Sequence, residues 1–177
     1  MTAYRLLPRY TVEDYQRWKG DWELWGGYAI ATSPSSFGRH QAIASRLLVM
    51  LSNAIEKTGC AAHAIAELDW IVSDDTVVRP DLILICGDVP EKHLSTPPAL
   101  VAEVLSNATR ENDLRFKYEL YQSQEVMVYL VIDPSANAVT FHRLVDGQYQ
   151  STTHTDFVEV VFCSDCNATI HVSQLFR

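Results

Sequence analysis

The sequence of 177 residues contains no long apolar run, and this absence excludes a helix that crosses a bilayer. Its first residues, MTAYRLLPRYTVEDYQRW, lack the apolar core and the small-residue cleavage site of a signal peptide. Internal repeats, low-complexity tracts and linkers are also lacking, so we expect residues 1–177 to form a single domain. We therefore expect a cytoplasmic location, in which the four cysteines are free thiols and no disulfide is needed.

Basic residues are too few for a protein that coats nucleic acid by bulk electrostatics. The chain has 14 Lys and Arg residues against 22 Asp and Glu residues, and its net charge is -8. A local basic groove is still compatible with this balance, because positive residues gather at two places. They are Arg39, His40 and Arg46, and then Arg110, Arg115 and Lys117.

Apolar periodicity and turn residues predict a mixed β-sheet with helices packed on it, in the α/β or α+β class. Two helices are expected early in the chain, a short one capped by Thr11 that reaches residue 18 and a long one at 38–58. A third is expected at 110–123. The expected strands are 22–25 and 28–31 around Gly26 and Gly27, a strand-like segment at 61–72, then 77–85, 99–105, 126–132, 139–144, 148–152 and 157–162.

Two carboxylates stand within apolar strands. Asp81 lies near the start of VRPDLILIC (78–86), and Glu103 lies inside PALVAEVL (98–105). A carboxylate in a strand that is buried on both faces must be paired, hydrogen-bonded or bound to a cation. If the two strands are neighbours, both side chains converge at one edge of the sheet. Two hard oxygen ligands there predict a Mg²⁺ site, since the cation also removes their mutual repulsion.

The helix after Glu103 supplies a positive charge. Lys117 lies one turn after Asp113, and we expect it to point towards the sheet edge or solvent. A lysine beside two metal-binding carboxylates orients or deprotonates a water and stabilises developing negative charge. Metal, water and lysine together indicate a phosphodiester hydrolase. The expected buried face of this helix consists of Leu114, Tyr118 and Tyr121.

Each of these residues alone also has a structural interpretation. Asp81 can cap a turn, because Pro-Asp is a common turn dipeptide. Glu103 can form an ion pair with an arginine such as Arg79. Lys117 can be a surface charge that pairs with Asp113 at helical spacing. The metal site is favoured for the three residues together, because it accounts for both buried carboxylates at once.

Several motifs in a fixed order resemble the Uma2 family, also called DUF820, which is assigned to the endonucleases of the PD-(D/E)XK superfamily. The likeness covers nearly the whole chain. Its segments are WELWGG (22–27), RPDL (79–82), VAEVLSNAT (101–109), the residues Asp113, Lys117 and Tyr121, and VIDP (131–134).

The resemblance implies a restriction-endonuclease-like core, in which a central mixed β-sheet is flanked by helices and preceded by a helix and a hairpin. It implies that Asp81, Glu103 and the backbone carbonyl of Val104 bind the metal, that Glu23 is a further acidic metal ligand, and that Lys117 is the catalytic lysine. The implied cofactor is Mg²⁺, which Mn²⁺ can replace. The implied partner is nucleic acid, with DNA as the expected substrate, and the implied assembly is a homodimer whose two sites cut two strands.

The sequence departs from the family pattern at three places. Leu105 stands where the superfamily has its lysine, and the following helix supplies Lys117 instead. Gly26-Gly27 replaces Asp-Gly, and EVMVYL (125–130) replaces Gly-Val-x-Glu-Tyr-Trp, which changes strand packing or an interface. Leu105 and the negative net charge favour an alternative, a catalytically silent DNA-binding or assembly protein. The combination of Asp81, Glu103 and Lys117 favours the hydrolase.

A zinc-binding module is a third interpretation. Cys163 and Cys166 have the spacing of a metal knuckle, and His154 and His171 complete four ligands. A lone C-x-x-C is a weak signal, however, and a turn with two free thiols is favoured. The sequence contains neither a phosphate loop nor a dinucleotide fingerprint, and it lacks a serine nucleophile flanked by glycines.

Overall fold

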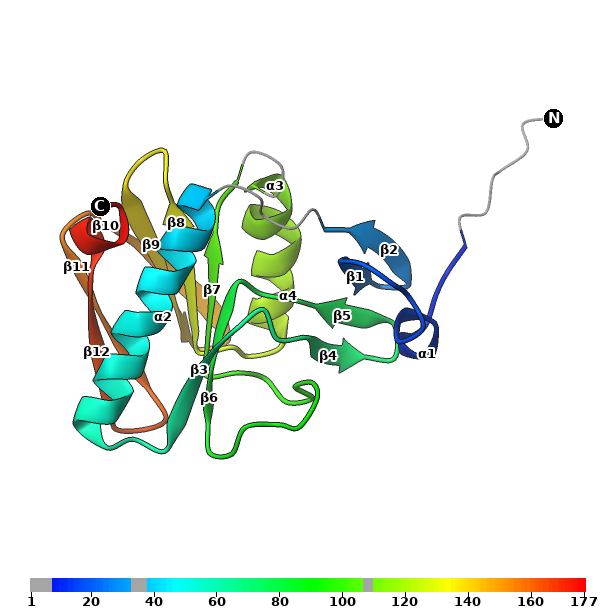
Figure 1. Cartoon of the computed structure of the whole chain (residues 1–177), viewed down its shortest axis with the longest axis horizontal. Helices are drawn as coiled ribbons and strands as arrows, with labels where there is room; N and C mark the ends of the chain where they lie inside the picture. Colours follow the sequence, from blue (N-terminus) through cyan, green and yellow to red (C-terminus); the bar gives the residue numbers. More distant parts are fainter. Residues whose placement is uncertain (1–7, 33–37, 107–109) are drawn as a thin grey trace.

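A central six-stranded sheet organises the chain (Figure 1). The computed structural model describes residues 8–32, 38–106 and 110–177, without the side chains of residues 112 and 113. The strands follow the order β10-β9-β8-β7-β6-β3, in which β7 and β8 are parallel and the other neighbours are antiparallel. This mixed sheet with helices packed on it confirms the predicted fold class. Its strands are β3 (Ala62–Ala66), β6 (Leu82–Cys86), β7 (Leu100–Val104), β8 (Val128–Asp133), β9 (Ala138–Val145) and β10 (Gln148–His154).

The two faces of the central sheet carry different layers. One face packs against α2 (Gly38–Thr58), the hairpin of β11 (Phe157–Phe162) and β12 (Cys166–His171), and the short helix α5 (Val172–Leu175). The other face packs against the helical segment that consists of α3 (Arg110–Asn112), η1 (Asp113–Lys117) and α4 (Tyr118–Ser123). Side chains along β7 alternate between the two cores, with Ala102 and Val104 towards α2 and Val101 towards α4. Glu103 therefore faces the α4 layer.

A smaller four-stranded sheet, with the order β2-β1-β5-β4, projects from the central sheet in Figure 1. The predicted hairpin is confirmed, since Gly26 and Gly27 adopt φ angles of 52° and 83° in the tight turn. Thr11 forms a capping box with Asp14, but the short helix ends at Tyr15 rather than at residue 18. The elements of this part are α1 (Val12–Tyr15), β1 (Trp22–Trp25), β2 (Tyr28–Ala31), β4 (Trp70–Ser73) and β5 (Thr76–Val78).

The predicted continuous strand at 77–85 is wrong. The chain forms β5 in the small sheet and then β6 in the central sheet, and residues 79–81 lie between them. Pro80 has no N–H for a sheet ladder, so it suits the break between two strands. The segment 61–72 is likewise divided into β3 and β4, with a positive φ of 51° at Glu67. Asp81 thus lies where the chain enters the central sheet.

The predicted helix at 110–123 contains a π-helical turn, η1. A π turn holds more residues than an α turn, so it shifts which side chains face the sheet. Leu114 is 46% exposed, so its expected burial is wrong. Lys117 is only 6% exposed, so of its two expected directions it takes the one towards the sheet rather than towards solvent. Tyr121 is fully buried, as expected.

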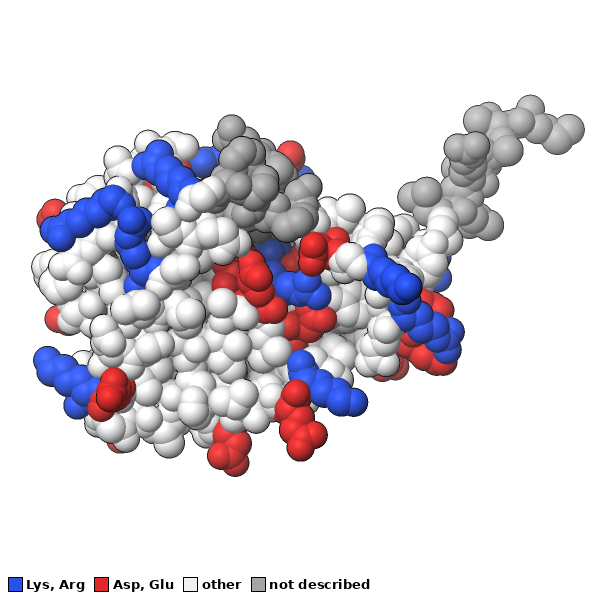
Figure 2. All heavy atoms as spheres, viewed as in Figure 1, with Lys and Arg blue, Asp and Glu red and all other residues white. Residues whose placement is uncertain are grey.

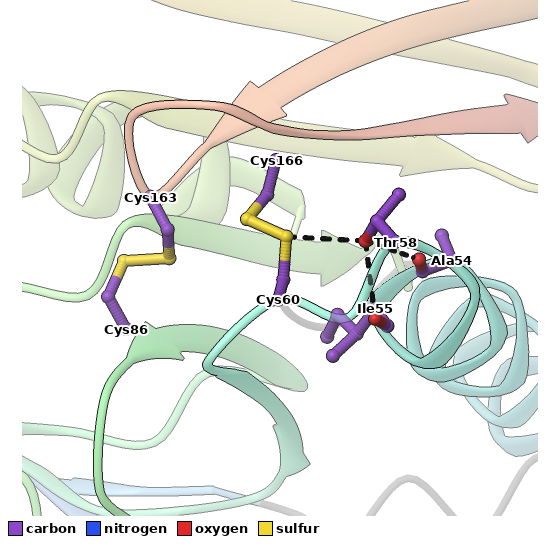
Figure 3. The surroundings of a disulfide bond; sticks show 7 residues. All are labelled: Ala54, Ile55, Thr58, Cys60, Cys86, Cys163 and Cys166. Carbon is purple, nitrogen blue, oxygen red and sulfur yellow. Dashed lines mark hydrogen bonds between the residues drawn. A yellow bond between two sulfur atoms is a disulfide. The ribbon is translucent and has the colours of Figure 1, made fainter.

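All four cysteines form disulfides (Figure 3). One bridge joins Cys60, after α2, to Cys166 at the start of β12, with a Cα–Cα distance of 6.1 Å. The other joins Cys86, at the end of β6, to Cys163 in the β11–β12 turn, with a Cα–Cα distance of 5.6 Å. The expectation of free thiols is therefore wrong. The pairing could not be predicted from the sequence, because the partners are 106 and 77 residues apart and only the folded chain brings them together.

Charges on the surface are mixed. In the view of Figure 2, Lys and Arg side chains are scattered among Asp and Glu side chains and form no single basic face. Among the helices that the structure describes, none combines the length and the apolar character that a membrane span requires.

Candidate active site

Asp81 and Glu103 meet at the end of the central sheet where β6 begins and β7 ends. The register pairs Leu82 with Ala102, so Asp81 stands opposite Glu103. The backbone N–H of Asp81 lies 3.4 Å from Oε2 of Glu103, and the backbone N–H of Val104 donates to Oδ2 of Asp81 over 2.7 Å. The two carboxylates that the sequence singled out are therefore neighbours. The turn-capping interpretation does not explain this contact of Asp81 with the next strand.

Glu103 is buried and held by two donors from the helical layer. Its side chain is on the α4 face of the sheet and the residue is 2% exposed. Nζ of Lys117 lies 2.9 Å from Oε1 of Glu103, and the hydroxyl of Tyr121 donates to the same oxygen over 2.7 Å. These contacts offset the cost of burying the carboxylate.

Lys117 lies between two acidic residues rather than at the surface. Besides its contact with Glu103, Nζ is 3.3 Å from Oε1 of Glu23. The interpretation of Lys117 as a surface charge is wrong, because the residue is buried; the side chain of Asp113 lies outside the described atoms. The π turn η1 ends at Lys117 and gives the side chain this inward position.

Arg79 does not pair with Glu103. Its guanidinium lies 2.6 Å from Asp69 and 3.1 Å from Asp21, so the proposed Glu103–Arg79 ion pair is wrong. The contact with Asp69 is the main reason why the pKa of Arg79 is raised. This network ties β1 and β4 together next to the site.

Glu23 on β1 has both oxygens engaged. Oε1 accepts a 2.7 Å hydrogen bond from the backbone N–H of Arg79, and Oε2 accepts one of 2.8 Å from Nε1 of Trp25. The ring of Trp25 stacks on Phe116 of η1 with a centroid distance of 4.1 Å. The small sheet therefore docks on the helical segment and presents Glu23 to Lys117.

His40 and Tyr121 are functional candidates whose contacts were missed in the sequence. Nε2 of His40, on α2, lies 3.1 Å from Oδ2 of Asp81, and the residue is buried. His40 has no partner at short sequence spacing, and nothing in the sequence connects it to a residue 41 positions later. Tyr121 was expected to be buried and belongs to the motif residues of the resemblance, but its contact with Glu103 was not expected. Burial, followed by the charge of Glu103, raises the pKa of Tyr121 well above its ordinary value, so its hydroxyl remains a neutral donor.

Solvent reaches the site beside Asp81. A small cavity of about 80 Å³ is lined by Asp81, His40, Gln41 and Glu67, among others. The side chain of Asp81 is 22% exposed, whereas Glu103 and Lys117 lie deeper. A ligand that enters from this side meets Asp81 first.

The carboxylates of Asp81 and Glu103 suit a cation that needs few protein ligands. With the four cysteines bonded as disulfides, no cluster of three or more His, Cys, Asp or Glu side chains suited to a metal occurs in the described parts of the chain. The oxygens of Glu23 contact Trp25, Arg79 and Lys117, and its role as a metal ligand stays a prediction. Asp81 and Glu103 remain as two neighbouring carboxylates. Mg²⁺ is bound in many proteins by one or two carboxylates and water, so these two residues fit it.

The zinc set that includes histidines is not formed. Cys163 and Cys166 are bonded to Cys86 and Cys60. His171 pairs with Phe157 at the opposite end of the hairpin from Cys166. Five residues of strand at about 3.4 Å each separate His171 from Cys166 by roughly 17 Å, which is too far for a shared ion.

Comparison with known proteins shows which proteins the chain is similar to. A family model named Uma2, described as "putative restriction endonuclease", matches residues 12–170. The uncharacterized protein slr1290 of Synechocystis sp. (strain ATCC 27184 / PCC 6803 / Kazusa) is 26% identical over 151 residues, which cover 81% of this chain and 79% of that protein. The crystal structure of a putative nuclease belonging to DUF820, from Anabaena variabilis ATCC 29413, superposes with a TM-score of 0.77 at 20% identity. The match covers 94% of this chain and 97% of that one.

Proposed function

The chain belongs to the Uma2 family, and from this premise we propose that it is a Mg²⁺-dependent endonuclease that hydrolyses phosphodiester bonds of DNA. One observation carries the proposal. Glu103 contacts Lys117 through Oε1 and lies next to Asp81 through Oε2, so two carboxylates and a buried ammonium share one site. Acidic ligands and a lysine are the groups that metal-assisted phosphodiester hydrolysis requires.

Asp81 and Glu103 are the side chains that would hold the cation, with the backbone carbonyl of Val104 as a predicted further ligand. A bound Mg²⁺, or Mn²⁺ in its place, supplies a Lewis acid for the phosphate and a water of lowered pKa. The contacts of Glu23 favour a different role from the predicted one of metal ligand. Glu23 helps to hold Lys117 in place, together with Glu103.

The protein side chains position one another for this chemistry. The imidazole of His40 and the N–H of Val104 both contact Oδ2 of Asp81 and so fix the orientation of its carboxylate. Tyr121 holds Oε1 of Glu103. Lys117 keeps a positive charge in a water-poor site, where it stabilises the charge that develops on a phosphate.

The proposal extends to the assembly and the location of the protein. One site of this kind cuts one strand, so cleavage of both strands of a duplex calls for a homodimer. A cytoplasmic location and the folding of residues 1–177 as one domain also belong to the proposal. Size-exclusion chromatography with light scattering measures the assembly directly.

Cleavage assays test the function. Supercoiled, linear duplex and single-stranded DNA, and RNA, are incubated with the protein in Mg²⁺, in Mn²⁺ and in EDTA. We expect nicking or cutting of DNA that requires the metal and that Glu103→Gln lowers by about 100-fold or more. Glu119→Gln, an exposed change on α4, is the matched control and should keep the activity.

The outcomes separate the two functions that the sequence left open. Metal-dependent cleavage that survives Glu103→Gln would overturn the assignment of the site. Binding of DNA without cleavage in any metal would support the catalytically silent alternative. Cleavage of RNA but not of DNA would show that the substrate is RNA and would overturn the proposal of DNA.

A further inference from the structure

The four cysteines of the chain converge on one place outside the candidate active site (Figure 3). Cys163 and Cys166 come from the β11–β12 turn, where the register ends with the pair Phe162 and Cys166. Cys60 and Cys86 come from the core. They are brought together because Ala62 pairs with Cys86 and the carbonyl of Ala61 accepts a 2.8 Å hydrogen bond from Gly87.

We propose that this cluster binds one Zn²⁺ when its two disulfides are reduced. Four thiolates in a tetrahedron are a common structural zinc site, and a Cys-x-x-Cys turn commonly supplies two of them. Here the turn supplies Cys163 and Cys166, while Cys60 and Cys86 supply the other two from neighbouring backbone segments. The cross-chain Cα distances of 6.1 and 5.6 Å already place each turn cysteine beside a core cysteine.

The proposed site requires movement of the cysteine side chains. With Zn–S bonds of about 2.3 Å, the sulfurs of a tetrahedral site are roughly 3.8 Å apart. Each bonded sulfur pair must therefore open by about 2 Å, and the two pairs must also turn towards one another.

The hydroxyl of Thr58 lies next to the cluster, with Oγ1 3.2 Å from Sγ of Cys60. Its closest acceptor is the carbonyl of Ala54 at 2.7 Å, so the hydroxyl marks one polar side of the cluster. The inner face of the hairpin is apolar, since Val158, Val160 and Phe162 pack in the core beneath α2.

The chemistry is balanced by a dithiol reductant. Each disulfide takes two electrons and two protons from one dithiol, which becomes a disulfide, and yields two cysteine thiols. Zn²⁺ then displaces the thiol protons, up to four of them, as the thiolates bind. Either form fastens the β11–β12 hairpin to the end of α2 and to β6, so the same cross-link is available in an oxidising and in a reducing compartment.

A metal titration of the full-length protein tests the proposal. The chain is reduced with a dithiol, the reductant is removed without air, and Zn²⁺ or Co²⁺ is added. We expect one Zn²⁺ per chain, together with the thiolate charge-transfer and tetrahedral absorption bands of the Co²⁺ form. The oxidised protein should bind no metal at this cluster.

Variants identify the ligands. Cys163→Ser/Cys166→Ser should weaken Zn²⁺ binding at least tenfold, whereas His154→Ala/His171→Ala should bind one Zn²⁺ as the wild type does. Cys163→His keeps four ligands and should retain the metal with a weaker charge-transfer band, which separates loss of a ligand from loss of the fold. Glu103→Gln should leave the stoichiometry unchanged. The proposal is overturned if the reduced wild type binds no Zn²⁺, or if the double cysteine variant binds it equally well.

Discussion

The ammonium Nζ of Lys117 lies 2.9 Å from Oε1 of Glu103, and both residues are buried. An ion pair in the interior depends on its geometry, because the two groups have lost their hydration. Glu23 and Tyr121 complete this geometry from the small sheet and from α4.

Lys117→Met should destabilise the protein strongly. The change leaves Glu23 and Glu103 buried without their shared cation, and removal of one partner of a buried pair costs about 3–5 kcal/mol. Urea unfolding monitored by circular dichroism measures the difference. Lys57→Met, at the exposed end of α2, is the control and should change stability by less than about 0.5 kcal/mol. An equal, small effect of both changes would mean that Lys117 is not held as described.

Tyr121→Phe should lower cleavage far more than a matched change of similar cost in stability. It removes the 2.7 Å hydrogen bond to Glu103, and loss of such support for a metal-site carboxylate lowers activity by about 10–100-fold. The control is Tyr149→Phe, which removes a 2.8 Å hydrogen bond to the carbonyl of Val126, away from the carboxylates. Each change should cost about 1–3 kcal/mol of stability. If Tyr149→Phe reduced cleavage as much as Tyr121→Phe, a general packing defect would explain both.

His40→Ala should weaken metal binding. The imidazole contacts Oδ2 of Asp81, and without it the carboxylate is less well oriented, so we expect a loss of about 10–100-fold in Mg²⁺ or Mn²⁺ affinity. Isothermal titration calorimetry with Mn²⁺ gives the affinity independently of cleavage. His63→Ala, at an exposed position on β3, is the matched control. Unchanged Mn²⁺ affinity of His40→Ala would show that the contact with Asp81 has no part in binding.

His142 should make the fold sensitive to acid. Burial lowers the pKa of His142 from 6.5 to about 4, so the folded state keeps the ring neutral. Above pH 6.5 the ring is neutral in both states and contributes no pH dependence. As the pH falls from 6.5 to 4, the unfolded state takes up the proton first, and stability should decrease by about 1–3 kcal/mol.

The acid effect can be isolated with a variant. Unfolding free energies of the wild type, His142→Gln and His63→Gln are compared at pH 7 and pH 4.5. His142→Gln should lose less stability on acidification than the other two proteins. The same loss in all three would assign the acid sensitivity to other groups.

The sequence predicted those parts of the fold that depend on local signals. Gly26-Gly27 favours a tight turn, and the hairpin around it forms. The expected strands 139–144 and 148–152 also pair, as β9 and β10. The apolar stripe of α2 predicted its bounds. β12 was not predicted, although Cys166–His171 alternates buried and exposed residues as a half-buried strand does. The helix α5 has only four residues, which is too short for a helical period to be recognised.

The candidate site was predictable only where residues broke a pattern. Asp81 and Glu103 stood out because carboxylates are unexpected in apolar strands. His40 and Tyr121 broke no pattern, and their contacts depend on the arrangement of the layers around the sheet. The disulfides were missed for the same reason, since their partners come from distant segments.

The number of residues in the π turn η1 decides where the side chain of Lys117 points. Lys117 reaches Glu103 across a separation of 14 positions, five of which lie in the wide turn. Deletion of one residue there would restore ordinary helical winding and rotate the lysine by about 100° around the helix axis. Substitutions at exposed positions such as Leu114 leave the direction of the Lys117 side chain unchanged. We therefore expect the site to tolerate a substitution in this helical segment more readily than an insertion or a deletion.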